Sequence, residues 1–396
     1  MSERRRWNFR RYLTHDAFIL ILLTGLAIVL FLAVGGLSRM FHAQQHALGE
    51  RWFARGVADL QSRRFDAAVI DFRTALRYAR DDYTYQLNLA EALIGAGRTS
   101  EANAYLINLW DRQPENGFVN LELARIAAQQ SETEKALRYY HNAIYATWPQ
   151  NEEMARHNTR LELIEYLLHI NAKTQAQSEL IALAANIADD PSQQRQLGDL
   201  FLRAQDYEHA LTAYRQSLKM DPHNPAALAG AGRAALQLAR YSEARNLLRS
   251  AVAANPNDKD SEERLKITEL VLQLDPFRPQ LSAADRNRSV LAAFNAAGER
   301  LNSCSATNNN AAATNNNAAA AASHNSSDPS SLPELSEEWR KLKLRLTENR
   351  LSRDPDLVNQ TMQLVFNIER KTNGTCGSLT EADDALLMIA RLHEGN

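Results

Sequence analysis

The feature that most constrains how this chain of 396 residues folds is a pattern that recurs along its middle. Each copy has an alanine twelve positions after a small residue (Ile164 in the fourth copy) and four positions before a large apolar residue. The marker alanines are Ala68, Ala102, Ala136, Ala176, Ala210 and Ala244. They lie 34, 34, 40, 34 and 34 residues apart, which indicates a six-residue insertion near residues 150–156. A fixed period of this length predicts stacked units that bury their apolar faces against each other.

The pattern resembles the tetratricopeptide repeat family over residues 49–258, in its period and in its residue types. In the clearest copies, Gly198 and Gly232 stand where two antiparallel helices approach closely, and Pro256 ends a second helix. The resemblance implies an all-α fold with about six helix-turn-helix repeats wound into a superhelix. An amphipathic stretch at 260–274 is expected to cap the array, which therefore occupies residues 49–274.

The chain changes character after the array. A helix is expected at 282–302, followed by an Asn-, Ala- and Ser-rich linker at 303–331. The linker contains too few large apolar residues to bury a core, so it is expected to be disordered. Residues 332–396 contain three more amphipathic stretches and are expected to form a small helical bundle, which the helix before the linker could complete.

The chain has two cysteines, Cys304 at the end of the helix before the linker and Cys376 in the loop before the last expected helix. If the region lies outside the cytoplasm, they could form a disulfide that ties the bundle across the linker. Two unpaired structural thiols are the alternative.

The N-terminus predicts a membrane anchor. Residues 17–37 are uncharged and apolar over a length that, as a helix, matches the ~30 Å hydrocarbon core of a bilayer. A cleaved secretion signal and a buried soluble helix are the alternatives. Residues 1–16 carry five arginines, and positive residues stay in the cytoplasm. We therefore expect a basic cytoplasmic tail and a single transmembrane helix, with the bulk of the chain in the periplasm of a bacterium.

Composition and motifs argue against several function classes. The net charge of −2 gives no reason to expect nucleic acid as a partner. Phosphate-binding glycine loops and the nucleophile elbow of hydrolases are absent, so we expect no cofactor and no catalytic activity. His42 and His46 are spaced for one helix face, but two histidines without a third ligand make a poor metal site.

A binding role is better supported. In the resembled family, the first helix of each repeat lines a concave groove that takes peptides. The matching positions here are Phe53, Val57, Leu87, Glu91, Leu121, Arg125, Leu161, Glu165, Arg195, Asp199 and Arg233. The three arginines could receive a carboxylate through paired hydrogen bonds, while the leucines could simply pack between helices. The Lys/Asn set with which some members clamp a C-terminal carboxylate is not reproduced, since Phe53 and Val57 occupy its first two places.

The leading hypothesis is therefore a membrane-anchored scaffold or adaptor in the periplasm, for envelope assembly, secretion or chaperone-like capture. One alternative turns the same scaffold toward the cytoplasm. Another makes the C-terminal bundle a regulatory or enzymatic module with the repeats as its targeting arm. Long helical arrays also assemble with each other, so a homo-oligomer stays open.

Overall fold

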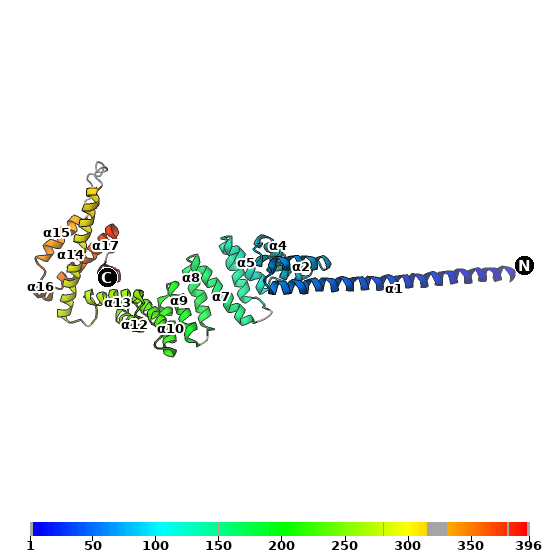
Figure 1. Ribbon diagram of the computed structural model, residues 1–396, viewed down its shortest axis with the longest axis horizontal. Helices are drawn as coiled ribbons and strands as arrows, with labels where there is room; N and C mark the ends of the chain where they lie inside the picture. Colours follow the sequence, from blue (N-terminus) through cyan, green and yellow to red (C-terminus); the bar gives the residue numbers. More distant parts are fainter. Residues whose placement is uncertain are drawn as a thin grey trace. The chain divides into compact units, whose positions relative to one another are not determined.

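The computed structural model describes residues 3–148, 151–187, 189–279, 281–314, 331–377 and 380–393 (Figure 1). Within these ranges there are eighteen helices and no strand, which confirms the predicted all-α class. The chain divides into two compact units, residues 1–166 and residues 167–396.

The first helix, α1 (Glu3–Gln61), is longer than expected. Its 59 residues contain both the predicted span at 17–37 and the first helix of the first repeat, which were predicted as separate elements. The intervening residues 38–48 contain no glycine or proline, so nothing there ends the helix. In the part of the chain that the structure describes, α1 is the one helix long and apolar enough to cross a membrane. Its apolar side chains from Leu22 to Leu37 are exposed.

In the first unit, the C-terminal part of α1 pairs with the helix that follows it, and further helix pairs come after. The helices are α2 (Phe65–Tyr78), α3 (Tyr83–Gly95), α4 (Thr99–Arg112), α5 (Gly117–Gln129), α6 (Thr133–Tyr145) and α7 (Glu152–His169). Local chemistry sets where first helices begin. The side chains of Asp82 and Asn116 accept hydrogen bonds from backbone N–H groups three residues on, as N-caps do.

The second unit continues the repeats and adds the C-terminal bundle. The repeat helices are α8 (Lys173–Ala184), α9 (Pro191–Arg203), α10 (Tyr207–Met220), α11 (Pro225–Gln237) and α12 (Tyr241–Ala254), followed by the capping helix α13 (Lys259–Leu274). The bundle contains α14 (Ala283–Thr314), α15 (Leu332–Lys343), α16 (Glu348–Arg353), α17 (Pro355–Cys376) and α18 (Glu381–His393). The repeat architecture that the sequence pattern predicted is confirmed in both units.

The core explains the sequence period. All six marker alanines have no exposed surface, because each packs where its helix meets a neighbour. The glycines opposite them are equally constrained. A Cβ atom on Gly56 would lie 2.7 Å from the ring of Phe72, and one on Gly232 would lie 2.7 Å from Leu248. Any larger side chain at these positions would push paired helices apart.

The turn between the two helices has the same conformation in all six repeats. This conformation was not predicted from the sequence. One residue per turn has a left-handed backbone, with φ between 56° and 74°. These residues are Arg63, Gly97, Ser131, Asn171, Gln205 and Ala239, and they follow the same 34, 34, 40, 34, 34 spacing. In every turn the next N–H bonds a carbonyl five residues back at 2.8–2.9 Å, which is the Schellman motif. The fourth repeat, the weakest in sequence, therefore turns as the others do.

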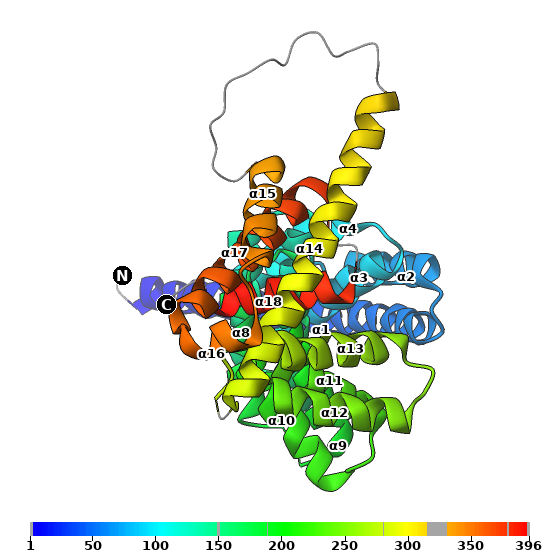
Figure 2. The same cartoon turned by 90° about the vertical axis from the view of Figure 1, so that its left-hand side faces the viewer.

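The bundle is built around α14. This helix continues to Thr314, which corrects the predicted linker start at residue 303; residues 315–330 lie outside the described part. Alanine favours helix, and Leu301 and Cys304 are buried, so α14 does not end at residue 302. α14 and α15 lie side by side (Figures 1 and 2). The Trp339 ring stacks on Phe294 with centroids 5.2 Å apart, and its Nε1–H donates to the Phe294 carbonyl at 3.0 Å.

Candidate functional site

The candidate site is the face that the first helices of successive repeats share. Val57, Glu91 and Arg125 are 34 residues apart on α1, α3 and α5, so they hold equivalent places in the first unit. Asp199 and Arg233 hold the same place on α9 and α11 of the second unit. Within each unit, the repeat therefore sets equivalent side chains in a row along one face.

The apolar part of this row packs between helices. The ring of Phe53 stacks on Tyr85, with centroids 4.7 Å apart, and lies 5.6 Å from the ring of Phe72. Val57 packs against the same apolar cluster, and Leu87 packs against the cluster of the following repeat. These three predicted groove residues therefore pack between helices and join neighbouring repeats. This packing role was the alternative to ligand binding for the apolar positions.

Four other predicted residues of the first unit remain partly or wholly accessible. Leu121 and Leu161 are half-buried, while Glu91 and Glu165 are exposed. Partial desolvation on this face raises the pKa of the Glu91 carboxyl. The face therefore presents carboxylates beside leucine side chains.

Arg125 is already occupied by the chain's own carboxylates. Its Nε and Nη2 donate to the two oxygens of Glu162 at 2.8 Å and 2.7 Å, and its Nη1 donates to Glu122 at 2.5 Å. The Tyr140 hydroxyl donates to the same Glu162 at 3.1 Å. Burial raises the pKa of the Glu122 carboxyl, and the Arg125 charge opposes this shift. Arg125 is thus a structural partner in this state, not the free carboxylate receptor that the sequence analysis expected.

A related network lies in the second unit. Arg195 donates to Asp199 at 2.5 Å, and the buried Tyr214 hydroxyl donates to the other oxygen of Asp199 at 2.6 Å. Burial, followed by this bond to Asp199, raises the pKa of Tyr214. The ring is held tightly, because a Cβ atom on Gly230 would lie 2.3 Å from it. Arg195, like Arg125, is paired internally.

Arg233 differs from the other two groove arginines. It has no hydrogen bond or ion pair to another residue in the described part of the chain, and its Nε is buried without a partner. Its charge acts at longer range on Tyr214 and Asp260. Of the three predicted arginines, Arg233 is the one without a carboxylate partner among the described residues.

The polar role of Tyr140 and Tyr214 was not predicted from the sequence. The residue type itself could have indicated this polar role. The equivalent positions in the first two copies are Phe72 and Leu106, which carry no hydroxyl. A buried hydroxyl needs a hydrogen-bond partner, so tyrosine at this position indicates an acceptor nearby.

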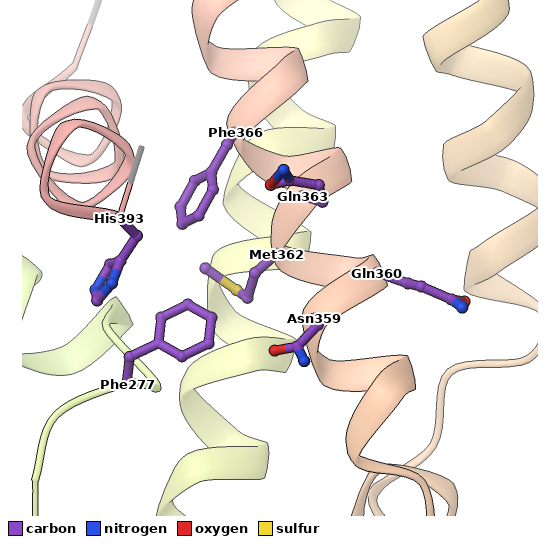
Figure 3. Close-up of a pocket in the computed structure, with 7 residues that line it drawn as sticks. All are labelled: Phe277, Asn359, Gln360, Met362, Gln363, Phe366 and His393. Carbon is purple, nitrogen blue, oxygen red and sulfur yellow. The ribbon is translucent and has the colours of Figure 1, made fainter. Parts of the chain in front are cut away.

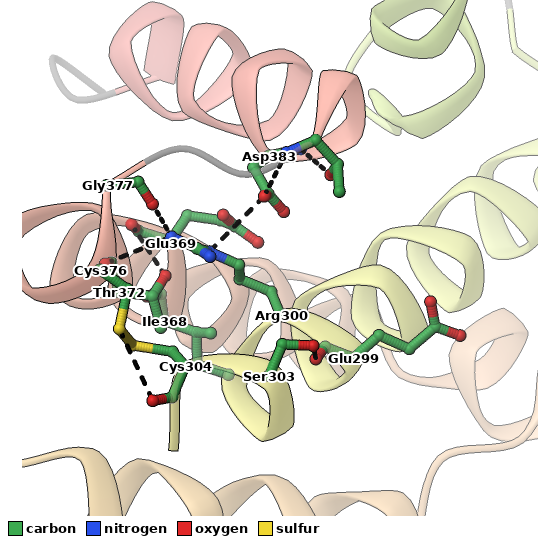
Figure 4. A network of polar contacts seen from close by, with 11 residues as sticks. Glu299, Arg300, Ser303, Cys304, Ile368, Glu369, Thr372, Cys376, Gly377 and Asp383 are labelled. Carbon is green, nitrogen blue, oxygen red and sulfur yellow. Dashed lines mark hydrogen bonds and ion pairs between the residues drawn. A yellow bond between two sulfur atoms is a disulfide. The ribbon is translucent and has the colours of Figure 1, made fainter. Parts of the chain in front are cut away.

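A second polar cluster lies inside the C-terminal bundle (Figure 4). Arg300, Glu369 and Asp383 are each at most 4% exposed. Arg300 lies 3.6 Å from the Asp383 carboxylate and donates to the carbonyls of Thr372 and Gly377. Neither carboxyl oxygen of Glu369 has a hydrogen-bond partner among the residues that the structure describes. Burial and the nearby Asp383 raise the pKa of Glu369 to about 8. Buried from solvent, this cluster has no access to a substrate.

The structure also pairs the two cysteines. The sulfurs of Cys304 and Cys376 are bonded, with their Cα atoms 5.8 Å apart, next to the Arg300 cluster (Figure 4). The bond joins α14 to the last residue of α17 across a separation of 72 residues.

No set of three or more metal-binding side chains is found among the described residues. His46 lies 3.4 Å from Glu50 on the exposed surface of α1, and the side chain of His42 lies outside the described part.

Comparison with known sequences identifies the repeats. Models of the tetratricopeptide repeat family match residues 53–105, 87–152 and 201–262. Two curated proteins, the Tetratricopeptide repeat protein 21 homologs of Caenorhabditis briggsae and Caenorhabditis elegans, are 26% and 25% identical over 195 residues. The alignments cover 48% of this chain and 14% of each relative, so the chain spans only a small part of those proteins.

Several solved structures of repeat proteins are similar to this chain at low identity. YrrB, described as a TPR protein with an unusual peptide-binding site, is 15% identical, covers 49% of this chain and 97% of its own, and has a TM-score of 0.39. PilF of Pseudomonas aeruginosa is 16% identical over 56% and 97% of the two chains, with a TM-score of 0.37. The C-terminal part of a TPR repeat-containing protein of Cytophaga hutchinsonii is 12% identical over 61% and 94%, with a TM-score of 0.44.

Proposed function

This chain is a tetratricopeptide-repeat protein, and on that premise we propose that it is a membrane-anchored scaffold whose first-helix face binds segments of partner proteins. Its ligands are proteins or peptides. The proposed anchor is the N-terminal part of α1, and the proposed location of the repeats is the periplasm, where the scaffold serves envelope assembly, secretion or chaperone-like capture.

The observation that best supports a binding role is that the three groove arginines differ in whether they have an internal partner. Arg125 and Arg195 are held by internal carboxylates, while Arg233 keeps a buried, unpaired Nε on the same face of the second unit. Because the Arg233 side chain is only partly buried and has no carboxylate partner among the described residues, its guanidinium group can pair with a ligand carboxylate. The first unit presents the exposed Glu91 instead. We infer that the face of the second unit takes acidic segments and the face of the first unit takes basic or neutral segments.

Two observations support the membrane and compartment parts of the proposal. The exposed apolar surface of α1 between residues 22 and 37 is costly in water and favourable in lipid. A disulfide such as Cys304–Cys376 persists in oxidising compartments such as the periplasm. The cytoplasm-facing alternative predicts reduced thiols at these positions.

The compartment is tested with two measurements on the full chain in cells. A reporter enzyme that is active only outside the cytoplasm is fused after Asp258, and the cysteines are alkylated with and without reductant. The proposal expects reporter activity and alkylation only after reduction. An inactive reporter together with freely reactive thiols would place the scaffold in the cytoplasm.

The groove is tested by photocrosslinking. A photoreactive amino acid replaces the exposed Glu91 on α3 or Gln237 on α11, and matched controls carry it at exposed Arg77 on α2 or Ser250 on α12. We expect discrete protein adducts from the first-helix positions and none from the second-helix controls. Equal adducts from both sets would contradict a ligand-binding role for this face.

A further inference from the structure

A second pocket, separate from the first-helix face, opens in the C-terminal bundle (Figure 3). It has a volume of about 670 Å³ and lies between α17, the loop after α13 and the end of α18. Its lining residues are Phe277, Asn359, Gln360, Met362, Gln363, Phe366 and His393. A volume of this size lies within the ~300–1,000 Å³ typical of ligand sites.

The pocket has an apolar floor and an amide rim. Met362 and Phe366 are at most 5% exposed, and Phe277 points toward them from the loop (Figure 3). Asn359 and Gln363 are exposed on the same face of α17, because positions i, i+3, i+4 and i+7 share one side of a helix. Each side-chain amide can both donate and accept hydrogen bonds, as a peptide main chain does.

His393 closes one end of the pocket. Its ring centroid lies 4.6 Å from that of Phe277, and its Nε2 lies 3.6 Å from the Asp275 carboxylate. This nitrogen is buried and has no hydrogen-bond partner within the described residues. The ring of His393 therefore forms part of the pocket wall, while its Nε2 faces Asp275.

The pocket continues beyond Phe277 and Asn359. A neighbouring pocket of about 280 Å³ shares these two residues and extends past Val358 to Arg286 at the start of α14. Arg286 is exposed and has no ion pair in the described part of the chain. Among the described residues that line these two pockets, Arg286 is the one with a permanent charge, and that charge is positive.

We propose that this groove binds an extended peptide segment that inserts an aromatic or aliphatic side chain between Phe277, Met362 and Phe366. The rim amides match the hydrogen-bonding groups of its main chain, and an acidic residue a few positions away lies near Arg286. One arginine is too little positive charge for a polyphosphate ligand or nucleic acid, and the amide rim offers nothing to lipid tails. Binding at this groove is independent of binding at the first-helix face, so an experiment can contradict one of the two proposals and leave the other standing.

The test uses the methyl resonances of the six methionines in the full chain, held in detergent micelles. The Met362 methyl is assigned with Met362→Leu. The probe is the peptide acetyl-Glu-Ser-Gly-Phe-Gly-Ser-Glu-amide, which carries an acidic residue on both sides because the groove can be entered in two directions. One control peptide has serine in place of phenylalanine, and another has lysine in place of both glutamates.

The proposal expects the phenylalanine peptide to shift the Met362 methyl at millimolar concentration, with the Met220 methyl unchanged. The serine peptide leaves Met362 unshifted, and the lysine peptide binds at least threefold more weakly. Gln363→Glu, an exposed rim change, weakens the acidic peptide by a similar factor without altering the free spectrum of the other methionines.

If the shift of the Met362 methyl resonance is small, binding is measured by cross-linking instead. Benzoylphenylalanine replaces the phenylalanine of the probe, and cross-linked fragments are mapped by mass spectrometry. Adducts on residues 355–376 that the unmodified probe displaces support the groove. Equal shifts with the serine peptide, shifts at all methionines alike, or adducts that do not compete would overturn the proposal.

Discussion

The buried Glu369 leads to a quantitative prediction about pH and stability. Its pKa is about 8 in the folded chain against an ordinary value of 4.5, because burial, followed by the Asp383 charge, disfavours the carboxylate. Between these two pH values the folded chain keeps a proton that the unfolded chain has released. Stability from this group is therefore fully present below about pH 4.5 and is lost as pH rises toward 8.

The size of the effect follows from ~1.4 kcal/mol per pH unit. The shift costs the wild type about 1 kcal/mol at pH 5, about 3 kcal/mol at pH 7 and about 5 kcal/mol at pH 9. Glu369→Gln has nearly the shape of the protonated acid and no charge to bury. We expect its stability advantage over the wild type to grow by about 2 kcal/mol between pH 5 and pH 7, and by about 1–2 kcal/mol more by pH 9.

The assay is urea unfolding of the second unit. Trp339 is the one tryptophan between residues 167 and 396, so the fluorine resonance of 5-fluorotryptophan at this position reports on the bundle. It is assigned with Trp339→Phe, and free energies of unfolding are compared at pH 5, 7 and 9. Glu334→Gln is the matched control, because Glu334 is an exposed acid on α15.

The reasoning is refuted if the wild type and Glu369→Gln respond to pH in parallel. That result would mean that Glu369 is ionised in the folded chain and that Arg300 stabilises its charge. A loss of stability in the variant at pH 5 would instead show that the glutamine amide does not fit the cluster.

Three further predictions concern other sites. Replacing Cys304 and Cys376 by serine should lower the free energy of unfolding of the bundle by about 4 kcal/mol, measured with the same Trp339 resonance, since the bond closes a loop of 72 residues. Ala239→Gly should raise the melting temperature by relieving a left-handed alanine (φ 56°), worth about 1 kcal/mol, and Gly97→Ala should lower it by a similar amount. Arg233→Ala should weaken binding of an acidic partner segment about tenfold by fluorescence anisotropy with little effect on unfolding.

The repeat fold could be predicted because its determinants are local and periodic. Helix contacts in each repeat require a small side chain, and the marker alanines and Gly56, Gly198 and Gly232 meet that requirement. Small residues at a fixed spacing can be recognised directly in the sequence. The left-handed conformation of the turns could not be predicted from the sequence, because in five of the six turns the left-handed residue is not glycine. The Schellman hydrogen bonds stabilise Ala239 and Gln205 in a conformation that their side chains disfavour, so residue type carries little signal.

The arrangement of side chains on the first-helix face was only partly predictable. The period places Arg125, Arg195 and Arg233 at related positions, but it cannot say which arginine is neutralised. That depends on Glu122, Glu162 and the tyrosine hydroxyls, whose distances are set by helix packing. The full length of α14 was missed for a different reason. A polar, repetitive composition suggested disorder, while alanine propensity and a buried Cys304 favour helix.

The unbroken α1 has a geometric consequence. An α-helix turns by about 100° and advances by about 1.5 Å with each residue. Because no joint separates residues 17–37 from the first repeat, the segment at 38–48 acts as a fixed angular offset between them. One inserted alanine would rotate the first repeat by about 100° around the axis of α1, whereas four would rotate it by only about 40° while moving it by about 6 Å along that axis. The length of this segment therefore sets the direction in which the first-helix face of the first unit points around α1, as an ordinary flexible loop could not.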